Sequence, residues 1–99
     1  MLQVQNKLHQ IELICKNHNV EQLYLFGSAT NSSFSAESDI DFLVTFKQFD
    51  LKKYFNNYIA LKEKLKSLFN REIDLVKTQT LKNPILIQSI NNSKELVYG

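Results

Sequence analysis

Two short runs decide the fold class of this chain: Leu25-Phe26-Gly27-Ser28 and Asp39-Ile40-Asp41-Phe42-Leu43-Val44. The first run is apolar until Gly27, which is typical of a buried strand that stops at a turn. The second run is rich in β-branched and aromatic residues and predicts another strand over residues 40–46. The small, polar stretch 28–38 between them predicts a loop with about one helical turn.

Helical periodicity flanks these two strands. Apolar residues recur every three or four positions over residues 4–15, which predicts a first helix. A longer stripe over residues 51–68 predicts an amphipathic helix with Asp50 as its N-cap. Pro84 suits the first turn of a last helix over residues 84–91, because its missing N–H is not needed there.

The remaining apolar runs complete the outline of one domain, residues 1–99. Ile73-Asp74-Leu75-Val76 predicts a third strand, and Leu96-Val97-Tyr98 is either a terminal strand or a packed tail. Helices and strands mixed in a chain of 99 residues predict an α/β or α+β fold, with helices covering one sheet. The order of elements alone does not decide between parallel and antiparallel pairing.

The composition excludes several classes of protein. With 43% hydrophobic and 22% charged residues, the chain is close to a soluble globular average. The net charge of +2 does not indicate nucleic-acid binding, and the single cysteine, Cys15, allows no internal disulfide. No apolar run approaches the roughly 20 residues that span a bilayer. We therefore expect a cytoplasmic protein; its oligomeric state stays open.

Asp39 and Asp41 are the first candidate functional residues. Residues two apart in a strand point to the same face, so the two carboxylates should project together. Like charges this close repel, and Asp is disfavoured in strands, so the arrangement needs a stabilising cation. Magnesium takes oxygen ligands and is commonly held by one or two carboxylates plus substrate phosphates.

Asp74 extends this pattern, because residues 73–76 echo residues 40–43. If the two strands pair, Asp74 can stand beside Asp41 and complete a three-carboxylate cluster suited to two metal ions.

Gly27-Ser28 follows a strand directly, as phosphate-binding turns do, and can offer backbone N–H groups and a hydroxyl. Each part has an ordinary alternative, namely a simple turn, a strand cap or an edge charge. The joint pattern is more specific than any part.

Gly27-Ser28, a spacer of ten residues, and Asp39-Ile40-Asp41 resemble the signature of the nucleotidyltransferase superfamily related to DNA polymerase β. The chain length and the stretches 72–76 and 94–98 resemble the minimal nucleotidyltransferase (MNT) group. The resemblance implies a mixed sheet flanked by helices. It also implies two Mg²⁺ ions held by Asp39, Asp41 and Asp74, and a triphosphate contacted by Gly27 and Ser28. Family members often carry an Arg after the Gly-Ser; here residues 29–33 contain none.

The resemblance also implies a reaction and a partner. Such enzymes transfer a nucleoside monophosphate, here expected to be AMP from ATP, to an acceptor hydroxyl. Members of the MNT group often act as antitoxins beside a HEPN-domain toxin, and some modify a tyrosine of that partner. Two alternatives stay open: a weakly active or inactive module that neutralises a partner by contact, and a homodimeric enzyme that modifies a small molecule such as an aminoglycoside.

The stretch 47–71 is strongly basic, whereas the charged residues of stretch 12–41 are mostly acidic. Its lysines are most simply interpreted as the solvated face of an amphipathic helix. The alternative is a docking surface for an acidic partner, RNA or substrate phosphates, which includes Tyr54 and Tyr58.

Overall fold

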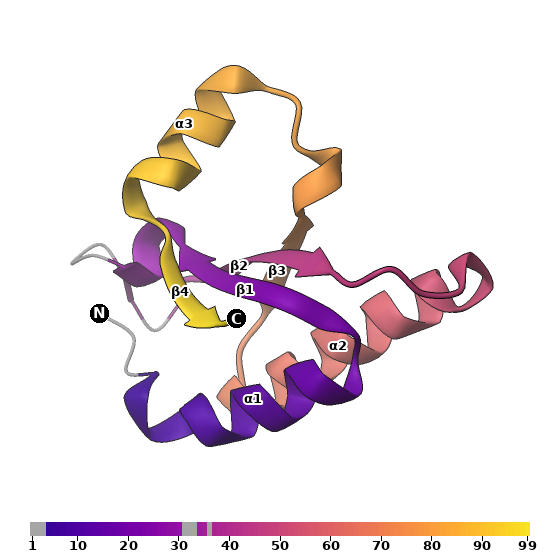
Figure 1. The fold of residues 1–99 in the computed structure, drawn as a ribbon. Coiled ribbons are helices and arrows are strands. Elements are labelled where there is room, and N and C mark those ends of the chain that lie inside the picture. The colour runs from indigo at the N-terminus through magenta and orange to yellow at the C-terminus, as the bar shows by residue number, and fades with distance from the viewer. Residues whose placement is uncertain (1–3, 31–33, 36) are drawn as a thin grey trace.

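The computed structural model describes residues 4–30, 34–35 and 37–99, and its centre is a four-stranded sheet (Figure 1). The strands are β1 (Val20–Phe26), β2 (Ile40–Phe46), β3 (Ile73–Lys77) and β4 (Glu95–Tyr98), in the spatial order β3-β2-β1-β4. β1 pairs antiparallel with both β2 and β4, whereas β2 and β3 are parallel. The expected small mixed sheet is confirmed, and the pairing that the sequence left open is decided.

Helices lie on both sides of this sheet (Figure 1). α1 (Leu8–Asn17) and α2 (Tyr54–Phe69) cover one face, and α3 (Pro84–Ser93) crosses the other face between β3 and β4. A parallel pair needs a long crossover connection, and α2 supplies it between β2 and β3. Among the described ranges, no helix combines the length and apolar character that crossing a membrane requires.

Alternation along β2 separates the two faces. Ile40, Phe42 and Val44 are fully buried, each 0% exposed, toward α1 and α2, whereas Asp41 is half-buried on the opposite face. This is the period of two that a strand with one face in the core imposes. The main buried partners of these β2 residues are Ile11, Cys15, Leu23, Leu25, Leu61, Leu65, Ile73 and Leu75.

The predicted elements are present, with shifted ends. β1 begins at Val20 rather than near Leu23, directly after Asn19, whose φ of 60° turns the chain out of α1. The Asp50 side chain accepts a hydrogen bond from Lys52 N, but it caps a short 3₁₀ turn, Leu51–Lys53, that leads into α2. The tail is a strand, β4. One helical turn, Gly27–Thr30, follows β1 as expected; residues 31–33 and 36 of that loop lie outside the described residues.

Asn83 fixes the start of α3. Its side chain accepts hydrogen bonds from Ile85 N and Leu86 N, and Pro84 occupies the first helical position. Asn83→Ala removes both bonds, so we expect it to lower the free energy of unfolding by about 1 kcal/mol and Tm by about 4–8 °C. Thermal unfolding followed by circular dichroism measures this loss. Asn92→Ala, an exposed change within the same helix, is the control, and equal Tm values in both variants would contradict the capping role.

Candidate active site

The pairing of β2 with β3 brings two of the predicted aspartates together. Asp41 and Asp74 are direct partners in the parallel ladder, between the pairs Ile40–Ile73 and Phe42–Leu75. Neighbouring strands lie about 4.8 Å apart, so the two carboxylates stand side by side on the face away from the core. Asp39 precedes β2 by one residue and is exposed. The strand argument therefore does not extend to Asp39, although its charge still acts on Asp41.

Gly27 meets the same aspartate from the end of β1. The last pair of the β1–β2 ladder is Phe26–Asp41, and Gly27 follows with φ of 74°, a left-handed conformation that favours glycine. A Cβ atom at this position would lie 2.4 Å from Asp41 Oδ2. The Thr30 hydroxyl donates to the Gly27 carbonyl oxygen at 2.7 Å and closes the turn that carries half-buried Ser28. The absence of a side chain at Gly27 therefore makes room for the Asp41 carboxylate.

The surroundings of Asp41 disfavour its ionised form. Burial raises the pKa of this carboxyl from 3.8 to about 6, and the charges of Asp74 and Asp39 add to the effect. The ion pairs found among the described residues, Lys16–Glu12 and Lys66–Glu72, lie elsewhere. The carboxylates thus repel one another, and a cation placed between them would relieve that repulsion.

The oxygen atoms of these carboxylates are suitable ligands for a hard divalent cation. Carboxylate oxygens are the ligands that Mg²⁺ prefers, and Asp41 and Asp74 are adjacent. Within the part of the chain that the structure describes, however, no three His, Cys, Asp or Glu side chains are drawn together into a metal-binding group. The β2–β3 ladder holds the backbones of Asp41 and Asp74 side by side, and their carboxylates can rotate toward a cation that binds there.

The raised pKa of Asp41 predicts opposite effects of pH without and with magnesium. The pKa of Asp41 is higher in the folded chain than the ordinary value of 3.8 expected in the unfolded chain. Asp41 therefore contributes stability below pH 3.8, and this contribution is lost as the pH rises through about 6. Because the carboxyl is only half-buried, screening by solvent reduces this contribution to about 1 kcal/mol or less. Mg²⁺ requires the ionised form, so it should raise Tm at pH 7.5 and hardly at pH 5. Thermal scans at both pH values test this, and Asp41→Asn should remove the Mg²⁺ response.

Arg71 is a site residue that the sequence did not single out. Its Nη1 donates to the backbone oxygens of Ser35 and Ser38 at 2.8 and 2.9 Å, and its guanidinium lies 4.2 Å from the Phe34 ring centroid. These contacts tie the segment that leads into Asp39 to the start of β3. Backbone oxygens carry no sequence signal, so Arg71 looked like one more charge of a basic stretch.

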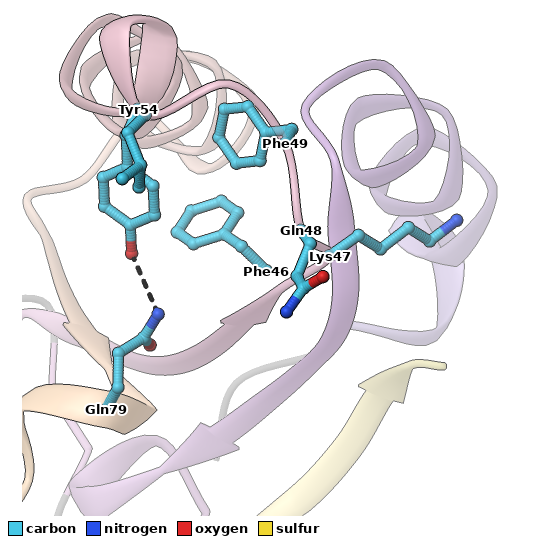
Figure 2. A pocket seen from close by; sticks show the side chains of 7 residues that line it. Phe46, Lys47, Gln48, Phe49, Tyr54 and Gln79 are labelled. Carbon is cyan, nitrogen blue, oxygen red and sulfur yellow. Dashed lines mark hydrogen bonds between the residues drawn. The ribbon is translucent and has the colours of Figure 1, made fainter.

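A cavity near the end of β2 lies away from the aspartates. Figure 2 shows this cavity of about 390 Å³ near the end of β2, where the Tyr54 hydroxyl accepts a hydrogen bond from Gln79 Nε2 at 3.4 Å. Phe46, which lines it, is five residues from Asp41, or about 17 Å along an extended strand. The cavity is therefore not part of the carboxylate site. Its lining residues are Phe46, Lys47, Gln48, Phe49, Leu51, Tyr54 and Gln79.

The sheet, the Gly-Ser turn and the paired aspartates are features of one class of enzyme domain. Residues 9–99 match the family described as Polymerase beta, Nucleotidyltransferase, and the chain belongs to this family. Within it, the chain is 30% identical over 89 residues to a Methanocaldococcus jannaschii protein provisionally named a protein adenylyltransferase. That match covers 88% of this chain and 84% of the relative.

Solved structures share the same fold. A structure provisionally described as a minimal nucleotidyltransferase superimposes with a TM-score of 0.76 at 22% identity, covering 93% of this chain and 90% of the other. A chain from a tri-AMPylated Shewanella oneidensis HEPN toxin in complex with MNT antitoxin gives a TM-score of 0.66 at 22% identity, covering 98% and 73%. The resemblance to minimal nucleotidyltransferases inferred from the sequence is confirmed at the level of fold and family.

Proposed function

We propose that this protein is a magnesium-dependent nucleotidyltransferase that transfers AMP from ATP to an acceptor hydroxyl, the hydroxyl of a tyrosine in a HEPN-domain partner. The observation that carries this proposal is the in-register pair Asp41–Asp74, with Gly27 seated against the Asp41 carboxylate. The carboxylate oxygens of these aspartates and the backbone of the turn at Gly27 meet at one point on the sheet. This is the arrangement that a triphosphate with its metal ions needs.

Each residue has a separate role in this proposal. Gly27 and Ser28 hold the triphosphate, since the turn at Gly27 brings backbone close to the aspartates. Asp39, Asp41 and Asp74 would hold Mg²⁺, which supplies charge neutralisation at the phosphates and a lowered pKa of the acceptor hydroxyl. Asp74, the more exposed member of the ladder pair, takes the hydroxyl proton. The acceptor oxygen bonds to the α-phosphorus, the bond from that phosphorus to the bridging oxygen breaks, and pyrophosphate leaves.

A second protein is the acceptor in this proposal. The M. jannaschii relative is named for protein adenylyltransferase activity, and the S. oneidensis complex holds an AMPylated HEPN toxin. The chain itself presents apolar side chains on the outer side of α2 and the turn before it, with Leu51 84% and Phe55 70% exposed. The exposed Lys52 and Lys53 stand between them in the chain, as expected for a surface that meets an acidic partner.

Transfer of label tests the proposal directly. The purified chain is incubated with Mg²⁺, ATP labelled at the α-phosphate, and a HEPN-domain protein from the same genome. We expect label in the partner and a gain in its intact mass equal to whole AMP units, lost when the modified tyrosine is changed to Phe. A partner that remains unlabelled while the chain demonstrably binds ATP would contradict protein AMP transfer.

The contact-only alternative has one observation in its favour, because no Lys or Arg stands between Gly27 and Asp39. A module of this kind would neutralise its partner without chemistry. The double variant Asp39→Asn/Asp41→Asn separates the two functions. If the double variant still neutralises the partner, neutralisation works by contact alone. If it loses both neutralisation and label transfer, neutralisation depends on the transfer of AMP.

A further inference from the structure

A second cavity, of about 230 Å³, lies beneath α3 on the same face of the sheet as the aspartates. Leu43 forms part of its lining and stands two residues after Asp41, so both side chains leave β2 on this face. The cavity therefore begins one step along the strand from the carboxylate pair. Its other principal lining residues come from α3 and the segments on either side of it: Leu81, Ile87, Ile90, Asn91 and Lys94.

The lining suits a flat heterocycle. Leu43, Leu81, Ile87 and Ile90 give apolar walls, and the Asn91 amide offers both a donor and an acceptor. The Thr78 hydroxyl also faces the cavity, but it already donates to the Val44 carbonyl oxygen at 3.0 Å. Pockets for drug-sized ligands span about 300–1,000 Å³. A cavity of about 230 Å³ therefore fits the base of a nucleotide better than the whole molecule.

Lys94 places a positive charge beside this cavity, on the same face of the sheet as the aspartates. Its Nζ lies 4.5 Å from the centroid of the Tyr24 ring. Tyr24 pairs with Leu43, and Phe26 pairs with Asp41, two residues further along the ladder. The ammonium group thus lies over a row of the sheet about 7 Å from the row of Asp41. Since no basic residue stands between Gly27 and Asp39, this cation from the other end of the chain is well placed for phosphates.

We propose that the cavity beneath α3 binds the nucleoside end of the nucleoside triphosphate, and that Lys94 contacts the phosphates that connect it to the aspartates. The inference rests on the proposed nucleotidyl transfer and adds a location for the base. The triphosphate lies at Gly27-Ser28 and the carboxylates. The base enters the apolar cavity next to Leu43, and the Asn91 amide hydrogen-bonds its edge.

Two ligands separate this inference from the proposed function. ATP carries both ends of the nucleotide, whereas inorganic triphosphate carries only the phosphates. With Mg²⁺ present, calorimetry on the wild-type chain should show ATP binding at least about tenfold tighter than triphosphate, because burying the base against the apolar walls of the cavity adds binding free energy that the phosphates alone lack. Equal affinities would overturn the base cavity alone. If neither ligand binds, the proposed function fails as well.

A pair of substitutions on α3 localises the effect. Ile87→Trp fills the cavity, and we expect it to weaken ATP binding at least about tenfold while triphosphate binding stays within about twofold. Ile85→Trp is the matched control, because Ile85 is 80% exposed on the same helix; it should change neither affinity. Unaltered ATP affinity in folded Ile87→Trp, checked by circular dichroism, would overturn the inference.

Two further variants keep the test decisive if Ile87→Trp fails to fold. Asn91→Ala changes an exposed helical position to a better helix former, so the fold should persist. We expect it to weaken ATP binding about three- to tenfold and to leave triphosphate binding unchanged; the same loss for both ligands would contradict contact with the base. Lys94→Met keeps an apolar stem and removes the charge, so it should weaken the binding of both ATP and triphosphate. Unchanged triphosphate binding in Lys94→Met would refute the phosphate contact.

Discussion

Asp41→Asn is expected to reduce nucleotidyl transfer at least about a thousandfold and to leave the fold intact. The substitution keeps the size of the side chain but removes a metal-binding charge at the centre of the site, where Asp74 and Gly27 both meet it. A thousandfold loss corresponds to about 4 kcal/mol of transition-state stabilisation, within what bound metal ions supply. Steady-state label transfer measures the loss, and circular dichroism checks the fold.

The same variant should be slightly more stable than the wild type when magnesium is absent. Burial and the charges of Asp74 and Asp39 disfavour the ionised Asp41, as its pKa of about 6 indicates, so a neutral amide removes that penalty at pH 7. Asp50→Asn is the control, because this exposed residue lies beyond the far end of β2 and Asn also caps helices. Wild-type turnover by Asp41→Asn would end the proposed mechanism.

Gly27→Ala is expected to lower stability and to abolish the response to magnesium and ATP. An L residue at φ of 74° costs about 1–2 kcal/mol, and the added Cβ would lie 2.4 Å from Asp41 Oδ2. The flexible end of the Asp41 side chain must move, which displaces the carboxylate from its place beside Asp74. We expect Tm to fall by about 4–8 °C for each kcal/mol lost. Thermal scans with and without Mg²⁺-ATP measure both effects.

Asn70→Ala is the matched control for Gly27→Ala. Asn70 ends α2 with φ of 53°, and its N–H donates to the Lys66 carbonyl oxygen, so Ala meets similar backbone strain there. The close approach to Asp41 Oδ2 occurs at Gly27, so the Asn70 variant should lose stability and keep the ligand response. If Gly27→Ala binds Mg²⁺-ATP as tightly as Asn70→Ala does, the close contact with Asp41 has no functional role.

Local patterning was enough to predict the elements and the central pair of aspartates. The alternation Ile40, Phe42, Val44 identified the buried face of β2, and the repeat of Ile-Asp in residues 40–41 and 73–74 anticipated the register that places Asp74 beside Asp41. Both signals are local in sequence, because a strand with one buried face must alternate. The positive φ at Gly27 fits the same turn that the Gly-Ser motif predicted.

The remaining features depend on contacts between distant segments. Lys94 lies over Tyr24 only because β4 pairs with β1, about 70 residues away in the chain. Arg71 holds the segment before Asp39 through backbone oxygens of Ser35 and Ser38, which any residues there would provide. Neither contact leaves a pattern in a single sequence. The positions of Lys94 and Arg71 depend on the tertiary structure and could not be predicted from the sequence alone.

The unequal anchoring of the two halves of the site has a consequence for how substrate enters. β2 and β3 carry the aspartates and are packed on the core, whereas α3 has a single buried residue, Ile90, and β4 is a four-residue edge strand. Lightly buried terminal units open at a lower free energy than core strands, as amide hydrogen exchange commonly reveals. We therefore expect residues 84–98 to open more readily than the β2–β3 ladder. Such opening would widen the entrance to the cavity beneath α3 while Asp41 and Asp74 stay in register.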